Sequence, residues 1–238
     1  IIFMALIFKF LDLKAHHKIY SPRVEEGRQS LEWRGHVNYD DRLEFNKSHH
    51  HVFETEYSWT GFWQSELEFH VSDKAETPLD WEKTEFQNQV QVLDYKNFAG
   101  AVYFSYNFVS EQDEPDEIEY KYLNEFNNEN VSFITNFIFE KQVGSRAGGS
   151  TTFDLSNYFY IKEVFFELID FGLIGFSDFG EISKFKVFGE QEHQYGFQLE
   201  SGFEMNNIEY EWAVGYLHGL TDASANHTII WNFEVEFN

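Results

Sequence analysis

The sequence predicts an all-β protein, a single antiparallel up-and-down transmembrane β-barrel of about twelve strands. Three observations lead to this prediction. Apolar residues recur at every second position in segment after segment, and the connections between these segments alternate in length. The apolar faces also hold more aromatic side chains than a small soluble core can enclose. The chain has 238 residues, of which 20% are Phe, Trp or Tyr, and this length fits one large domain or two small ones.

The period-two pattern begins near residue 29 and continues to the end of the chain. The last segment shows it clearly, with apolar residues at Ile229, Trp231, Phe233, Val235 and Phe237. Such alternation is typical of strands whose two faces meet different surroundings. Most segments contain about 9–12 residues, the length that a tilted strand needs to cross a bilayer.

The connections between the predicted strands give a second, independent signal, because long and short ones follow each other in turn. A transmembrane barrel has long loops at one end and short turns at the other, whereas a soluble sandwich has no reason to sort its loops in this way. The long connections are expected at 40–50, 72–79, 109–117, 142–150, 170–192 and 218–226, and the short ones at 60–61, 93–97, 127–130, 161–163 and 204–207.

The face opposite the apolar one is acidic and carries only two obligate cations, Arg34 and Lys121. We expect the apolar face to meet lipid and the acidic face to line the lumen. The alternative is a soluble lipocalin-like barrel or sandwich that turns its polar face outward. The predicted lumen-facing acids are Glu32, Glu54, Glu56, Glu66, Glu68, Glu119, Glu125, Glu209, Glu211, Glu234 and Glu236.

Composition excludes several other classes of protein. The formal charge of −24 argues against a nucleic-acid partner, because the phosphate backbone requires a basic surface. The absence of cysteine excludes a disulfide scaffold and a thiolate metal site. No apolar run approaches the roughly 20 residues of a membrane-spanning helix. The aromatic content argues against a disordered acidic chain.

Three regions are expected along the chain. Residues 1–15 form an apolar stretch that is typical of the end of a secretory signal peptide, although an N-terminal strand or helix docked on the domain is the alternative. Residues 16–28 are expected to be a periplasmic N-terminal segment, and residues 29–238 the barrel. An even number of strands places both ends of the barrel on the side of the short turns.

The last segment resembles the terminal strand of Gram-negative outer-membrane barrels, which closes with an aromatic residue that the barrel-assembly machinery reads. Trp231, Phe233, Val235 and Phe237 match that pattern, with Asn238 following the final aromatic residue. Residues 23–35, 139–145 and 215–224 are similar to a group of proteobacterial outer-membrane proteins. The resemblance implies a barrel in the bacterial outer membrane, with lipid and the assembly machinery as partners. It brings no established activity, catalytic residue or cofactor.

The acidic inner face is the strongest functional feature of the sequence. Carboxylates without matching bases cannot lie in a dry interior, so they must be hydrated, partly protonated or accompanied by cations. We therefore predict a water-filled lumen that acts as a passive pore or binding channel for small cationic or polar solutes. The alternative is a structural or surface-interaction barrel with a plugged lumen. The apolar connection at 170–192 either folds into the lumen as that plug or extends strands above the membrane.

The sequence offers two further candidate sites. A lipid-acting hydrolase would need a nucleophile and a base in contact, and Ser201 and His218 are expected near opposite ends of neighbouring strands. His49, His50 and His51 could bind Zn, Cu or Ni, but adjacent strand residues point to opposite faces and do not form one tetrahedral site. The sequence therefore predicts neither an enzyme nor a bound cofactor.

Overall fold

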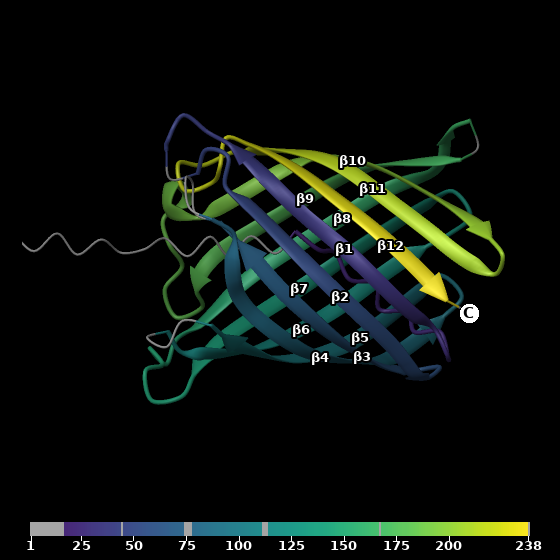
Figure 1. The fold of residues 1–238 in the computed structure, drawn as a ribbon, viewed down its shortest axis with the longest axis horizontal. Helices are drawn as coiled ribbons and strands as arrows, with labels where there is room; N and C mark the ends of the chain where they lie inside the picture. Colours follow the sequence, from purple (N-terminus) through teal and green to yellow (C-terminus); the bar gives the residue numbers. More distant parts are fainter. Residues whose placement is uncertain (1–16, 44, 74–77, 111–113, 167, 238) are drawn as a thin grey trace, which may run out of the picture.

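The computed structural model describes residues 17–43, 45–73, 78–110, 114–166 and 168–237. Twelve antiparallel strands close into one barrel, in which each strand pairs with its sequence neighbours and β1 pairs with β12 (Figure 1). The predicted fold class is confirmed. The strands are β1 (Gln29–Tyr39), β2 (His49–Thr60), β3 (Trp63–Ser72), β4 (Asp80–Tyr95), β5 (Phe98–Val109), β6 (Asp116–Asn127), β7 (Val131–Val143), β8 (Thr151–Phe165), β9 (Ile169–Glu181), β10 (Glu192–Met205), β11 (Ile208–Gly219) and β12 (His227–Phe237).

The side chains of each strand alternate between the outside of the barrel and its interior. In β1, Leu31 and Trp33 are exposed while Glu32 and Arg34 are buried. The outside of the barrel is correspondingly rich in exposed Phe, Tyr, Trp, Leu and Val side chains, as a lipid-facing surface requires. Among the described residues, the single helical element is a 3₁₀ turn at Phe188–Glu190. No helix there is long and apolar enough to cross a membrane.

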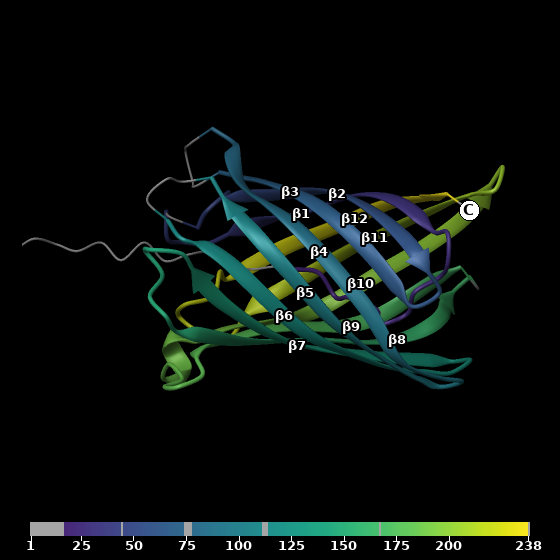
Figure 2. The same ribbon diagram turned by 90° about the horizontal axis from the view of Figure 1, so that it is seen from below.

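Loop lengths alternate around the barrel as predicted. The short turns lie at 61–62, 96–97, 128–130, 166–168 and 206–207, at the end of the barrel where the C-terminus lies (Figures 1 and 2). The turn at Asn206–Asn207 has positive φ at both residues, which is the two-residue hairpin geometry that matches strand twist. Nine of the eleven connections lie within three residues of their predicted ranges.

The sequence prediction was wrong about the ninth strand. β8 continues to Phe165, and residues 169–181 form β9 rather than part of a long loop. The alternation of apolar and polar residues is absent there because the lumen-facing positions hold a small residue, Gly172, and an apolar one, Ile174. The Tyr158 ring lies over Gly172, and Ile174 packs in a buried cluster with Tyr158. The remaining connection is 182–191, so the predicted 170–192 loop does not plug the barrel but mostly lengthens its wall.

Residues 17–28, predicted to lie in the periplasm, run inside the barrel instead. The backbone N–H of Tyr20 donates to Asn136 on β7, and Arg28 donates to Glu234 on β12. We call residues 17–28 the lumen segment. The predicted signal-peptide remnant, residues 1–15, lies outside the described residues.

The lipid-facing assignment predicts a strong dependence on depth. Phe104 lies near the middle of β5 with its side chain on the outside, and Tyr95 lies at the turn end of β4. We expect Phe104→Arg to lower the free energy of unfolding by about 2–4 kcal/mol in bilayers, and Tyr95→Arg by about 0–1 kcal/mol. Urea unfolding in liposomes measures both. Equal costs at the two depths would contradict the lipid-facing assignment.

Candidate functional site: an acidic cavity in the lumen

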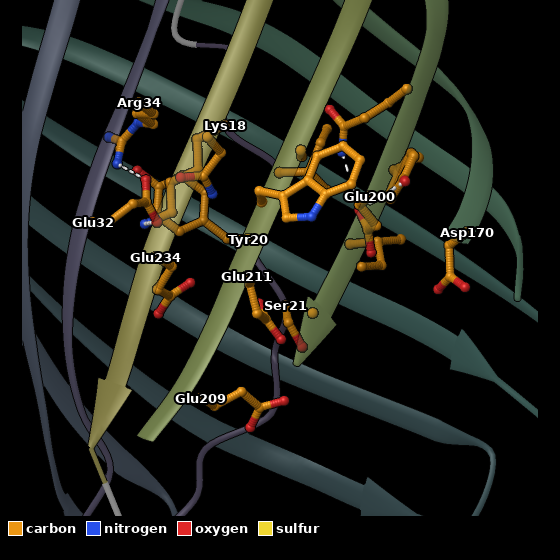
Figure 3. A pocket seen from close by; sticks show the side chains of 18 of the residues that line it. Lys18, Tyr20, Ser21, Glu32, Arg34, Asp170, Glu200, Glu209, Glu211 and Glu234 are labelled. Atoms are coloured by element: carbon orange, nitrogen blue, oxygen red, sulfur yellow. Dashed lines mark hydrogen bonds and ion pairs between the residues drawn. The ribbon is translucent and has the colours of Figure 1, made fainter. Parts of the chain in front are cut away.

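The barrel interior holds a cavity of ≈ 700 Å³. It lies in the half of the barrel nearer the short turns, between the lumen segment and the inner faces of several strands (Figure 3). Four basic side chains line it: Lys18, Arg23, Arg28 and Arg34. Acidic side chains outnumber them; they are Glu32, Glu54, Glu56, Glu66, Glu163, Asp170, Glu200, Glu204, Glu209, Glu211 and Glu234.

Strand register places six glutamates of the barrel interior, four of which line the cavity, directly opposite one another across neighbouring strands. We call them the glutamate row: Glu211, Glu234, Glu32, Glu54, Glu68 and Glu85, on β11, β12, β1, β2, β3 and β4 in that order. Residues paired in this way have Cβ atoms about 4.5–5.5 Å apart, and like charges at that spacing repel. The row is therefore stable only with water, protons or cations between its members.

Two cations neutralise the middle of the glutamate row. Arg34 Nη1 lies 2.6 Å from Glu32 and 2.5 Å from Glu54, and its Nη2 lies 2.6 Å from Glu68. Lys18 Nζ, from the lumen segment, lies 2.5 Å from Glu54 and 3.3 Å from Glu32. The two basic side chains thus share the same carboxylates, and one of them is supplied by a segment that is not part of the barrel wall.

The lumen segment carries two more cations that meet wall carboxylates. Arg23 Nε lies 2.9 Å from Glu125, and Arg28 Nη2 lies 3.0 Å from Glu234 and 2.9 Å from Glu236. The segment therefore presents a basic residue at every fifth position, 18, 23 and 28, and each one reaches a different group of acids. Sequence reasoning missed this role because it placed the segment outside the barrel.

Tyr20 anchors the lumen segment against the other side of the barrel. Its backbone N–H donates to Asn136 Oδ1 at 2.8 Å, and Asn136 Nδ2 donates back to its carbonyl at 2.9 Å. Lys121 Nζ lies 3.7 Å from the centroid of the Tyr20 ring and 4.1 Å from that of Tyr103, while pairing with Glu119 at 2.8 Å. These contacts hold the lumen segment against β5, β6 and β7.

The cavity end near the short turns keeps an excess of negative charge. Among the described residues, six of its acids form no ion pair: Glu163, Asp170, Glu200, Glu204, Glu209 and Glu211. Glu200 accepts hydrogen bonds from the Tyr158 hydroxyl and from Gln198. Register places Glu204 opposite Glu209, so this end also holds paired like charges.

The predicted lumen acids divide into two groups in the structure. Seven line the cavity: Glu32, Glu54, Glu56, Glu66, Glu209, Glu211 and Glu234. The other four, Glu68, Glu119, Glu125 and Glu236, are buried in the barrel, where each meets a basic side chain.

The structure also places the candidate hydrolase residues and the terminal-strand residues that the sequence singled out. Ser201 on β10 pairs in register with Trp212 on β11. His218 lies six residues beyond Trp212 on the same strand, so Ser201 and His218 are about 20 Å apart. Ser201 and His218 therefore do not form a nucleophile–base pair. The strand β12 places the side chains of Phe233 and Phe237 on the outside of the barrel.

The three adjacent histidines do not converge. His50 faces the lumen, where its Nε2 lies 3.3 Å from His70 Nδ1. His51 stacks on Trp33, which is exposed on the outside of the barrel, and His49 stacks parallel to His51.

Two long loops contact each other at the end of the barrel away from the short turns. Arg42 donates to both Asp40 carboxylate oxygens, at 2.8 and 2.7 Å, and to the Ser224 carbonyl at 2.6 Å. The N–H of Asn226 donates to Asp40 Oδ2 at 2.9 Å. The first and last long loops are thereby joined, and the hydrogen bonds from Arg42 hold the pKa of Asp40 well below its usual value.

This loop contact predicts a defined pH response. Because the pKa of Asp40 is lowered in the folded loop, its stabilisation is fully present above the usual value near 3.9 and is lost as pH falls through the lowered one. Amide exchange at Asn226, corrected for its intrinsic rate, should stay constant from pH 7 to 5. Asp40→Asn should raise it several-fold at both pH values. Equal exchange in the variant and the unmodified protein would contradict the role of Asp40.

Comparisons with known proteins identify the fold. No family model matches the chain, and no curated relative matches its sequence. A crystal structure of the NanC porin matches with a TM-score of 0.61 and 9% identity, covering 87% of this chain and 99% of that one. The KdgM porin matches with a TM-score of 0.56 and 10% identity, covering 88% and 98%. KdgM in complex with disordered oligogalacturonate gives 0.55 and 11%, covering 88% and 98%. These matches show that the chain shares the closed barrel fold of these porins.

Proposed function

We propose that the protein is an outer-membrane channel for the passive passage or binding of small cationic or polar solutes, and that it comes from the proteobacterial group that its sequence resembles. The observation that carries this proposal is the excess of acidic side chains in the cavity, including six that form no ion pair among the described residues. A water-filled space with walls of one sign concentrates ions of the opposite sign.

The charge of the lumen favours cations over the acidic sugars named for one structural neighbour. KdgM was solved in complex with oligogalacturonate, which is a chain of uronates and therefore an anion. In this protein, the glutamate row would repel such a ligand wherever Lys18 and Arg34 do not neutralise it. We therefore expect this chain to share the barrel of those porins but to select for the opposite charge.

The lumen segment supports a further detail of the proposal. Its three basic side chains pair with wall carboxylates that a cationic solute would otherwise reach. We propose that it acts as an internal plug that limits conduction while it is docked. The same contacts also favour a second function, a structural barrel with a permanently blocked lumen. The two functions differ in whether conductance rises when the segment's contacts with the wall are removed.

The proposal is tested by removing charge from the open end of the cavity. The variant Glu204→Gln, Glu209→Gln, Glu211→Gln loses three acids that line it. The control Glu129→Gln, Glu190→Gln, Asp222→Asn loses three exposed acids on the connections. In planar bilayers under a KCl gradient, we expect the first variant to shift the reversal potential away from the K⁺ value and the control to match the unmodified protein. An identical shift in both, or anion selectivity in the unmodified protein, would overturn the proposal.

A further inference from the structure

Three histidines from neighbouring strands meet inside the barrel. They lie between the glutamate row and the end of the barrel that carries the long loops. His36, His50 and His70 lie on β1, β2 and β3, and their successive ring centroids are 5.3 Å apart in both steps. Strand register explains the meeting, because His36 pairs directly with His50, and His70 pairs with Val52, two residues along β2. The proposed channel function does not use these side chains.

The hydrogen bonds of His70 fix which of its nitrogens carries a proton. His70 Nε2 lies 2.7 Å from Glu68 Oε2, and Glu68 is itself paired with Arg34 at 2.6 Å. An ionised carboxylate only accepts, so His70 Nε2 carries the proton and Nδ1 presents a lone pair. A histidine that donates one ring N–H to a carboxylate is the usual arrangement of a metal-binding histidine.

The lone pair of His70 Nδ1 faces a second imidazole nitrogen, His50 Nε2, at 3.3 Å. Ligand atoms around a tetrahedral Zn²⁺, each at about 2.0–2.1 Å, are about 3.3 Å from one another. The spacing therefore equals that of two imidazoles bound to one metal ion. In the structure the two nitrogens lie at hydrogen-bond distance, and the lone pair on His70 Nδ1 makes His50 Nε2–H the donor.

A carboxylate lies beside the same nitrogen. Glu82 Oε2 is 3.5 Å from His50 Nε2, and the Glu82 side chain is 40% exposed. Glu82 has no partner in the β3–β4 register, because the strands shift there between His70 and Val71, and this bulge lets its side chain turn toward the lumen. The exposed carboxylate offers both a third ligand and a route for an ion from solvent.

We propose that His50 and His70 bind one divalent transition-metal ion of the Zn²⁺ class, with Glu82 rotating to complete the protein ligands and water as the fourth. Imidazole and carboxylate ligands suit Zn²⁺, Ni²⁺ or Cu²⁺ rather than Mg²⁺ or Ca²⁺, which prefer sets of oxygen atoms. Each of the two nearest cations lies against a carboxylate that offsets its charge: Arg34 pairs with Glu68, and Lys83 Nζ lies 3.6 Å from Glu85.

The chain provides matched controls for this site. His49 and His51 flank His50 in sequence but belong to the outer face, so their replacement removes the same chemistry from outside the lumen. We would titrate ZnCl₂ into the untagged, refolded full chain by isothermal calorimetry. We expect one site, which His50→Asn or His70→Asn weakens about 10–100-fold and His49→Asn or His51→Asn leaves unchanged.

Two further measurements keep the proposal testable if a lumen variant folds poorly. X-ray absorption of the Zn²⁺-loaded unmodified protein should show two imidazole nitrogens and oxygen ligands at about 2.0–2.1 Å. MgCl₂ should give no matching site, which separates this site from general uptake of cations by the lumen acids. The metal-site proposal would be overturned by oxygen ligands alone, by equal weakening in the His49 and His51 variants, or by no Zn²⁺ binding. None of these results bears on whether the barrel conducts cations.

Discussion

Removing the three basic side chains of the lumen segment should open the barrel. In the variant Lys18→Gln, Arg23→Gln, Arg28→Gln, every ion pair that the described residues form between the segment and the wall is lost. Apart from Arg23–Asp94, whose carboxylate is exposed, each pair is partly or wholly buried. The buried carboxylates then need water or mobile cations, which favours an undocked segment and a hydrated lumen. We expect the mean single-channel conductance to rise several-fold over that of the unmodified protein.

The matched control is Lys47→Gln, Lys96→Gln, Lys184→Gln, which removes the same charge from exposed positions on the connections. Its conductance should equal that of the unmodified protein. If neither triple variant conducts more than the unmodified chain, the lumen segment is not a plug. The structural barrel with a blocked lumen would then be the better description.

Arg34→Met should cost more stability than any other single replacement of a basic residue in the lumen. The Arg34 guanidinium is buried and contacts Glu32, Glu54 and Glu68. Removing it leaves buried carboxylates with too little positive charge, which typically costs about 3–5 kcal/mol. Urea unfolding in detergent micelles, followed by tryptophan fluorescence, measures the change.

Arg42→Met is the control for that measurement. Its side chain is 34% exposed and joins two loops rather than neutralising the glutamate row. We expect a loss of about 1 kcal/mol or less. Adding Glu68→Gln to Arg34→Met should recover part of the stability, because it removes one of the unpaired charges. Equal losses at Arg34 and Arg42 would show that the row does not depend on Arg34.

The barrel was predictable because its two faces meet different solvents. Alternation at positions such as Leu31, Glu32 and Trp33 reports lipid on one side and water on the other, and it needs no knowledge of distant residues. β9 escaped prediction because Gly172 and Ile174 replace polar residues on its inner face. Where the lumen wall is itself apolar, the pattern that marks a strand disappears.

The candidate site was only partly predictable from the sequence. The pattern assigned Glu32, Glu54 and Glu68 to one face, but whether they lie opposite one another depends on the register of each hairpin and on closure of β1 against β12. The alternation rule applies to strands and therefore could not place the lumen segment. The one signal in the segment itself was its basic residues at every fifth position, Lys18, Arg23 and Arg28.

The central claim is that the acidic lumen passes cations once the three basic side chains of its lumen segment are replaced. The most direct test is the reversal potential of the Lys18→Gln, Arg23→Gln, Arg28→Gln variant under a tenfold KCl gradient, measured beside the Lys47→Gln, Lys96→Gln, Lys184→Gln control. We predict a value close to that of an ideal K⁺ electrode, about 59 mV with the sign that K⁺ permeation gives. A value near zero, or one of the opposite sign from Cl⁻ permeation, would contradict the claim.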